Sequence, residues 1–457
     1  MKKLEIKNDI LNDKPSVLLL KLSVPYLISS VMCIFTTSLL NDIYISSCKV
    51  IFSILGYISV ILNFFVALVS NIVSAGWIKL SKEINSKETS IKATMNGIYA
   101  VVIFTVIFSL FLIIFNRPIL KFTKVPESLF SETRIYFIVY IASYIIAAVG
   151  SMLITISNAH SNIITLLISF MLSQCLNTLV GFIILVLLKL DIIGAGLITS
   201  ATNIFIILFS IVNLRKKRII KRGVKQDYLP DFKLIGKVLK YSSYLVLHNV
   251  LCHGSYYIVS IKTNACLPTD YIMILSVNLP LQGPLSALAI SANIFFPVNF
   301  SSGKTQRCKS FLNLIVVIGL IYGCVCAFLY AVLGNWYFSN LFEDARIIAY
   351  GKSYWVYYGL GFILFPMLVT VRYFLESIGY GRFSFFAGAA EATGNLISAF
   401  WLIDALGTTG RSLATTLGYS ISGIYLIVIY YSIRKKIWKE CDGNAVPMLR
   451  SNDTPVL

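Results

Sequence analysis

Apolar runs long enough to cross a lipid bilayer recur along the whole chain. A transmembrane helix needs about 20 predominantly apolar residues. Segments such as Phe182–Leu188 and Ile204–Val212 lie inside such runs and show no clean amphipathic stripe. Only 13% of the residues are charged, whereas a soluble protein needs about 25% to cover its surface. The sequence therefore predicts an all-α, multi-pass membrane protein whose surface largely faces lipid.

Twelve stretches match this pattern. The eighth contains Pro280, Pro284 and Pro297, and the tenth contains Arg372, so these two match it least well. The expected spans are residues 16–40, 50–77, 94–115, 135–157, 162–188, 192–214, 241–261, 271–298, 310–333, 349–375, 383–403 and 412–433.

The basic residues predict the orientation of these spans. With the N-terminus in the cytoplasm, 27 of the 39 Lys and Arg residues fall in inner segments and 9 fall in outer segments. The other three lie within expected spans: Lys21 and Lys352 near the span ends, and Arg372 deeper in the tenth span. This bias follows the positive-inside rule and predicts two cytoplasmic termini in the cell membrane. The polar N-terminal segment has no cleavable signal pattern, so the first span is expected to direct insertion.

The net charge of +19 raises the question of a nucleic-acid partner. The densest basic run, Arg215–Arg222, directly follows a span in the longest inner loop. We interpret it as a topology determinant that contacts anionic lipid, and we expect no nucleic-acid binding. The nine cysteines show no CxxC spacing, so we expect neither a disulfide framework nor a metal site.

The two halves of the chain echo each other at an offset of about 217 residues. Tyr136–Tyr140 corresponds to Tyr354–Tyr358, and Asn177 corresponds to Asn395. Since six spans is an even number, both halves enter from the same side, which predicts two six-helix lobes related by a parallel pseudo-two-fold repeat. The expected parts are an inner N-terminal segment (1–15), a first lobe (16–214), a basic inter-lobe loop (215–240), a second lobe (241–433) and a cytoplasmic tail (434–457).

Such a repeat is typical of secondary transporters, whose substrate site lies near the midplane between the halves. No phosphate-binding loop or catalytic motif appears in the chain, so we expect no enzyme activity and no cofactor. Energy would then come from an ion gradient or from a separate subunit. A non-transporting scaffold or sensor is the alternative of another class, but it would need a sizeable soluble domain to signal through.

Several segments together carry a family resemblance over about residues 15–433. They are Leu22–Pro25, Ser74–Lys87, Asn116–Pro118, Arg372–Gly381 and Ala387–Glu391. In order and spacing they resemble the multidrug and toxic compound extrusion (MATE) family, bacterial type. The resemblance implies two six-helix lobes around a V-shaped cavity, and proton- or sodium-coupled export of bulky, often cationic, organic compounds.

The chain departs from the family where coupling carboxylates usually stand. At the first-span Asp position it has Asn41, and Asp42 follows one residue later, a rotation of about 100° on a helix. The fifth-span acid is replaced by Gly181, and the seventh-span acid is absent, with His248 nearby. Either coupling has moved to the second lobe, or this chain transports differently.

The second lobe offers Glu391, which with Asn395 and Ser398 follows i, i+4, i+7 spacing on one helix face. Glu391 either binds the coupling cation or fixes helix packing, because a charge inside a span is costly without a partner or cavity. Arg372 and Glu376 are spaced i, i+4 near the inner end of the tenth span, which favours a structural ion pair that gates that end.

The sequence thus predicts an antiporter that exports small organic, cationic molecules by alternating access, is embedded in the bilayer and acts as a monomer. A flippase for a lipid-linked or amphipathic substrate is the alternative within transport. It would need Arg or Lys for phosphate, and the spans have few. Candidate residues are Glu391, Asp42, Asn41 and His248 for cation or proton coupling; Asn177, Asn249, His253, Tyr256 and Asn395 for the substrate cavity; and Arg372 with Glu376 for gating.

Overall fold

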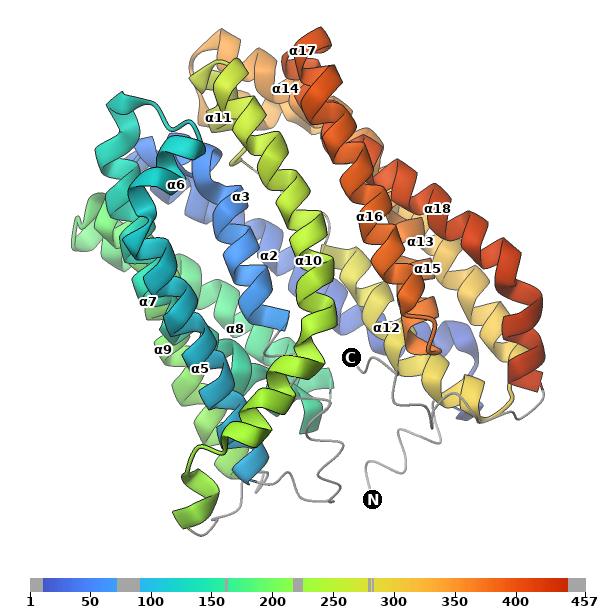
Figure 1. Cartoon of the computed structure of the whole chain (residues 1–457). Coiled ribbons are helices and arrows are strands. Elements are labelled where there is room, and N and C mark those ends of the chain that lie inside the picture. Colours follow the sequence, from blue (N-terminus) through green and yellow to red (C-terminus); the bar gives the residue numbers. More distant parts are fainter. Residues whose placement is uncertain are drawn as a thin grey trace. The chain divides into compact units, whose positions relative to one another are not determined.

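A computed structural model describes residues 11–71, 91–160, 163–216, 225–277, 281 and 283–442 (Figure 1). All regular secondary structure within these ranges is helical, which confirms the predicted all-α fold class. Ser74–Lys87 and most of the basic run Arg215–Arg222 lie outside the described residues.

The helices of the first half follow the first six expected spans. A short helix, α6 (Asn116–Phe122), separates the third and fourth of them. The others are α2 (Pro15–Ser47), α3 (Val50–Asn71), α5 (Ile91–Ile114), α7 (Glu127–His160), α8 (Ile163–Gly181) with the π-helix η2 (Phe182–Leu187), and α9 (Asp191–Lys216).

The helices of the second half are more often interrupted. After a short 3₁₀ turn, η3 (Lys225–Tyr228), they are α10 (Phe232–Cys266), α11 (Thr269–Ile274), α12 (Gly283–Ser301), α13 (Thr305–Leu341), α14 (Ala345–Leu360) with the 3₁₀ turn η4 (Gly361–Ile363), α15 (Phe365–Ser377), α16 (Arg382–Ile397) with the π-helix η5 (Ser398–Leu402), α17 (Ile403–Leu406) and α18 (Thr408–Asp442).

Within the described residues, eight helical stretches are long and apolar enough to cross a membrane. The count of twelve spans therefore stays a prediction. The stretches are Leu27–Ser47, Val50–Val69, Ile91–Ile114, Glu127–Ile154, Asp191–Arg215, Thr305–Leu341, Ala345–Ser377 and Thr408–Asp442.

The helix starts reproduce the repeat seen in the sequence. The starts of α2, α3, α5, α7, α8 and α9 correspond to those of α10, α11, α13, α14, α16 and α18, each pair separated by about 217 residues. A π-helix follows both α8 and α16. Because π-helices are rare and occur mostly as short bulges, their occurrence at matching places is independent support for duplication.

The eighth expected span, 271–298, differs from the prediction of one continuous helix. Helix α11 ends at Ile274, and the next helix, α12, begins only at Gly283. Pro284 lies in the first turn of α12, where a missing backbone N–H costs nothing, and Pro297 lies within the helix. Pro284, one of the prolines that weakened the sequence pattern, therefore lies next to a real break in the helix.

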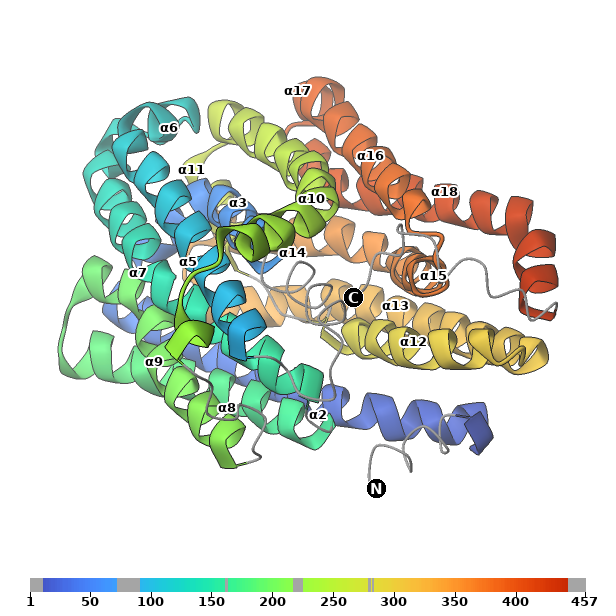
Figure 2. The same cartoon turned by 60° about the horizontal axis from the view of Figure 1, so that its bottom comes forward.

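The helices group into two compact units, each described separately. The N-terminal unit comprises residues 32–279, and the C-terminal unit comprises residues 1–31 with 280–456. In the N-terminal unit, α7 packs against α5 and α9, and α10 packs against α3 and α5 (Figure 1). In the C-terminal unit, α16 packs against α18, α13 against α14, and α12 against α15 (Figure 2). The assignment of the two lobes to residues 16–214 and 241–433 stays a prediction.

Helix α2 contributes to both units. Its early part lies in the C-terminal unit, where a Cβ on Gly283 would come within 2.7 Å of the Ser30 hydroxyl oxygen. Its later part lies in the N-terminal unit, where the Thr178 hydroxyl donates to the Thr36 carbonyl oxygen at 3.1 Å. The break between units thus falls within a helix, which periodicity alone gives no reason to expect.

Candidate functional site

Glu391 lies where α16 crosses α18. A Cβ on Gly394 of α16 would come within 2.7 Å of the backbone nitrogen of Gly418 in α18, so the two backbones are in direct contact. Small residues at such crossings let transmembrane helices approach closely. On Gly418, a Cβ would lie 3.3 Å from the Glu391 Cγ and 3.1 Å from the Asn395 Oδ1. Both side chains therefore lie against α18, as their shared helix face predicts.

The rest of this interface is held by hydroxyl groups. The Ser398 hydroxyl donates to the Gly410 carbonyl oxygen at 2.9 Å, and the Ser422 hydroxyl donates to the Ala387 carbonyl oxygen at 2.8 Å. Glu391 is 8% exposed, while Asn395 and Ser398 are fully buried. Glu391 is thus a buried carboxylate in a close helix–helix contact. Such a group can hold a proton or a cation, and it can equally well fix helix packing.

Arg372 and Glu376 form the ion pair that their spacing predicts. The Arg372 Nε donates to the Glu376 Oε1 at 3.0 Å within α15. Both side chains are mostly buried, at 20% and 12% exposed, so the pair is shielded from water more than a surface pair. Its role in gating stays a prediction.

Asn41 and Asp42, at the end of the first expected span, differ in burial. Asn41 is buried and Asp42 is exposed, as expected for neighbours about 100° apart on α2. The residue that occupies the family's acid position is therefore buried, while the carboxylate one position later is exposed. Coupling by Asp42 in the manner that the resemblance implies would need a different geometry.

The polar residues of α10 do not share a single environment. His248 is buried, and its Nε2 lies 3.7 Å from the Cys252 sulfur one turn later. The ring of His253 lies 6.5 Å from that of Phe64 in α3. Asn249 and Tyr256 are partly buried. Among the described residues, no three His, Cys, Asp or Glu side chains gather as a metal-binding group.

Asn177 of α8 repeats part of the Asn395 arrangement. It is partly buried, and its Oδ1 accepts a hydrogen bond from the Thr202 hydroxyl of α9 at 3.2 Å. Helices α8 and α9 correspond by the repeat to α16 and α18. The two Asn residues thus contact equivalent neighbours, but the first half has no carboxylate at the place of Glu391, where Ser173 stands.

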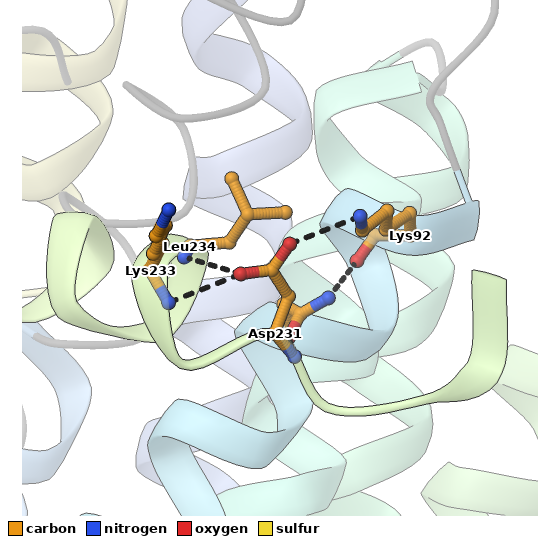
Figure 3. A network of polar contacts seen from close by, with 5 residues as sticks. Lys92, Asp231, Lys233 and Leu234 are labelled. Carbon is orange, nitrogen blue, oxygen red and sulfur yellow. Dashed lines mark hydrogen bonds and ion pairs between the residues drawn. The ribbon is translucent and has the colours of Figure 1, made fainter. Parts of the chain in front are cut away.

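A polar network ties the start of α10 to α5 (Figure 3). The Asp231 carboxylate pairs with the Lys92 ammonium at 2.9 Å and accepts hydrogen bonds from the backbone N–H groups of Lys233 and Leu234. The Asp231 N–H donates to the Asn96 Oδ1 at 2.6 Å. The hydrogen bond from Lys92, followed by those from the backbone, holds the pKa of Asp231 below its usual range.

Comparisons with solved structures identify the fold. A MOP superfamily transporter from Pyrococcus furiosus, reported to have a binding pocket of reverse polarity, superposes with a TM-score of 0.72 at 13% identity, over 94% of this chain and 98% of its own. A MATE family multidrug resistance transporter in an outward-facing conformation also matches (TM-score 0.71, 14% identity, 94% of this chain and 98% of its own). So does one in an inward-facing conformation (TM-score 0.72, 12% identity, 94% of this chain and 99% of its own).

The chain has the MATE fold. At 12–14% identity this likeness concerns the fold alone, and it confirms at that level the resemblance drawn from the sequence. No protein-family profile matches the sequence, and comparison with curated proteins finds no match either.

Within the MATE fold, the candidate residues divide between the two units. The C-terminal unit holds Glu391, Asn395, Arg372 and Glu376, and the N-terminal unit holds Asn41, Asp42, Asn177, His248, Asn249, His253 and Tyr256. Glu391 and Asn395 are brought together against Gly418, and Arg372 meets Glu376.

One charged residue of this MATE fold was not among the candidates of the sequence analysis. Arg411 stands just before the twelfth expected span, 412–433, but it lies in the first turn of α18 and is only 8% exposed. Its Nε and Nη1 have no hydrogen-bond partner in the described part of the chain. The repeat could have pointed to Arg411, because the corresponding residue in the first half is the uncharged Ala195, which lies in α9.

Proposed function

We propose that this chain is a secondary transporter that exports small organic compounds, cationic ones among them, across the cell membrane by alternating access. The observation that carries the proposal is the MATE fold over 94% of the chain. Multidrug resistance transporters of the MATE family with this fold have been solved in an outward-facing and in an inward-facing conformation. A fold that serves alternating access in those proteins is suited to the same motion here.

Energy for export would come from proton or sodium influx. The sequence has no phosphate-binding loop, which favours a gradient over ATP. Glu391 is the group best suited to couple the ion, because it is a buried carboxylate against a close helix crossing. A relative shift of α16 and α18 would change the surroundings of Glu391 and hence its affinity for a cation.

The proposal is tested by reconstitution into liposomes with an imposed proton or sodium gradient and a panel of fluorescent organic cations. We expect Glu391→Gln to lower gradient-driven export by about tenfold or more, equivalent to about 1.4 kcal/mol or more of coupling free energy. Gln keeps the shape and hydrogen bonding of Glu but cannot change charge, so the variant separates coupling from packing.

The matched control is Glu343→Gln, which removes one carboxylate from an exposed position between α13 and α14. It should export at the wild-type rate. If Glu391→Gln exports at the wild-type rate with unchanged pH dependence, Glu391 serves packing, and coupling would be sought at Asp42, His248 or Glu376. If the wild-type protein exports no member of the panel under either gradient, the transport proposal itself fails.

The flippase alternative is favoured by one observation. The buried Arg411 guanidinium keeps two donor groups without a partner in the described residues, and such groups suit a phosphate or carboxylate. A flippase would move fluorescent phospholipid analogues between leaflets of the same liposomes, and Arg411→Gln would slow that movement. Absence of lipid movement beside export of organic cations would exclude this alternative.

The proposed setting follows from the charge bias and the fold. The chain would act as a monomer in the cell membrane with both termini in the cytoplasm, without enzyme activity or a bound cofactor, the proton or sodium ion being transported. A scaffold or sensor would move none of the fluorescent cations in the liposome assay, whichever gradient is imposed. The same experiment therefore decides between a transporter and a non-transporting protein.

A further inference from the structure

A basic cavity of about 1170 Å³ lies in the N-terminal unit, outside the candidate coupling and substrate residues. Its walls come from α6 and the loop that follows it, the first turns of α7, and the last turns of α10. Helix α6 follows the C-terminal end of α5, whereas Lys92, in an expected inner segment, lies at the N-terminal end of α5. The charge distribution therefore predicts that the cavity opens on the outer side of the membrane.

Four cations line the cavity against one acid. The cations are Arg117, Lys121, Lys124 and Arg134, and the acid is Glu127. No ion pair joins any of the four to an acidic side chain within the described part of the chain. The cavity therefore carries a formal charge of about +3 that the protein leaves uncompensated.

This concentration of charge runs against the bias of the rest of the chain. Of the 9 Lys and Arg residues in the expected outer segments, these four lie between positions 117 and 134. Cations in short outer loops oppose the positive-inside rule. A cluster that opposes this tendency suits a function that needs concentrated positive charge, such as the binding of an anion.

The frame of the cavity is fixed by hydrogen bonds. The Arg134 Nε donates to the Asn116 Oδ1 at 2.8 Å, and the Asn264 Nδ2 donates to the carbonyl oxygens of Thr123 at 2.8 Å and Tyr57 at 3.1 Å. These bonds tie α6 to α7 and tie α10 to both the end of α6 and α3. A ligand therefore meets walls whose positions are largely set before it binds, which lowers the entropic cost of binding.

The backbone at the cavity rim is also held in an unusual conformation. Lys124 has φ 62, in the left-handed region that a lysine rarely adopts. This conformation follows the end of α6 and turns the chain into α7 at Pro126, which also lines the cavity. Such strain is found where the surrounding structure requires it, often at ligand-binding sites.

The cavity lining also includes apolar side chains. They are Val125, Phe130, Ile135 and Ile138, and Ile135 is 42% exposed. Cations beside apolar side chains at the expected membrane boundary match a ligand with a phosphate group and an attached apolar part. We propose that this cavity binds a phosphate-bearing anion through Lys121, Lys124 and Arg134.

The test uses the full-length protein in detergent, with phosphatidylglycerol in mixed micelles, phosphatidylcholine as the uncharged comparison, and inorganic phosphate as the soluble probe. Bound lipid is counted by native mass spectrometry. We expect wild type to bind phosphatidylglycerol in preference to phosphatidylcholine. The double variant Lys121→Gln/Lys124→Gln should lower that affinity about 25-fold, from about fivefold for each removed charge.

The matched control is the double variant Lys49→Gln/Lys189→Gln. It removes two exposed cations that lie outside the cavity in other outer segments, and Lys189 shares the left-handed conformation, with φ 51. The control should bind as wild type does. Arg117→Gln serves as a second cavity variant, with a loss of about fivefold, and size-exclusion profiles establish that all variants are folded.

Inorganic phosphate distinguishes the two sources of the same chemistry. In one outcome, inorganic phosphate displaces the lipid and also protects wild type, but not the cavity variant, against thermal unfolding. That result would assign the site to a free phosphate compound. Lipid binding that phosphate does not displace assigns it to a headgroup. Equal losses in the cavity and control variants, or no binding of either probe, would overturn the proposal. Neither result depends on transport.

Discussion

The contact between α16 and α18 makes a quantitative prediction about Gly394. A Cβ at this position would lie 2.7 Å from the backbone nitrogen of Gly418 and 2.8 Å from the carbonyl carbon of Leu417. Ordinary van der Waals contact begins near 3.4 Å. Because both close atoms belong to the backbone, no rotamer change can make room, and Gly394→Ala must push the two helices apart by about 0.7 Å.

The expected cost combines two opposing effects. Overpacking of a close contact costs about 1–3 kcal/mol. Replacing Gly by Ala within a helix returns about 0.5–1 kcal/mol. Gly394→Ala should therefore lower the free energy of unfolding by about 1–2 kcal/mol. Gly418→Ala should cost less, because its nearest contacts, at 3.1–3.3 Å, include the movable side chains of Asn395 and Glu391.

The assay is SDS-induced unfolding of the purified protein in mixed micelles. Gly254→Ala in α10 is the matched control, since a Cβ there would meet nothing within 4 Å and only the gain in helix propensity should remain. Stability should then rank Gly254→Ala above wild type, followed by Gly418→Ala and Gly394→Ala. If Gly394→Ala were as stable as Gly254→Ala, the close crossing would be refuted, and with it the burial of Glu391 against α18.

Three further predictions concern charge, topology and energy source. The pKa of Asp231 is lowered in the folded protein, so its contribution to stability is full above pH about 4 and is lost as the pH falls below that value. Asp231→Asn should therefore lower the thermal midpoint by more at pH 7 than at pH 3; an equal decrease at both would contradict the role of the Lys92 pair. In a cysteine-free background, Thr269→Cys should react with an impermeant thiol reagent from outside and Lys436→Cys only from inside; labelling of both from one side would exclude an even number of spans with inner termini. The purified protein should not hydrolyse ATP, and ATP-driven uptake by the protein alone would contradict a gradient-driven mechanism.

The sequence was sufficient for the fold class and for much of the helix pattern. In lipid every backbone N–H and C=O group must be bonded within its own segment, so long apolar runs have few alternatives to a helix. The matching starts of helices such as α9 and α18 follow from the repeat in the same way. Even the weakest expected span, 271–298, was marked by the prolines that accompany the break between α11 and α12.

Side-chain surroundings within the candidate site were only partly predictable. Helical spacing alone placed Glu391 and Asn395 on one face and set Arg372 one turn from Glu376, because both relations are local. The same reasoning left Arg411 outside its helix, since hydropathy falls at a charged residue whether or not neighbouring helices cover it. Burial of Arg411 depends on residues distant in sequence.

The tertiary structure alone decided which surfaces meet. No sequence pattern states that Gly418 lies against Glu391, that α2 is divided between two compact units, or that cations from α6 and α7 gather around one cavity. Hydropathy and helical periodicity are properties of neighbouring residues, and they report how a segment meets lipid or water. The pairing of one helix with another depends on shape and charge across long separations in the chain, and the forces between apolar helices in lipid are too alike to select a partner without those details.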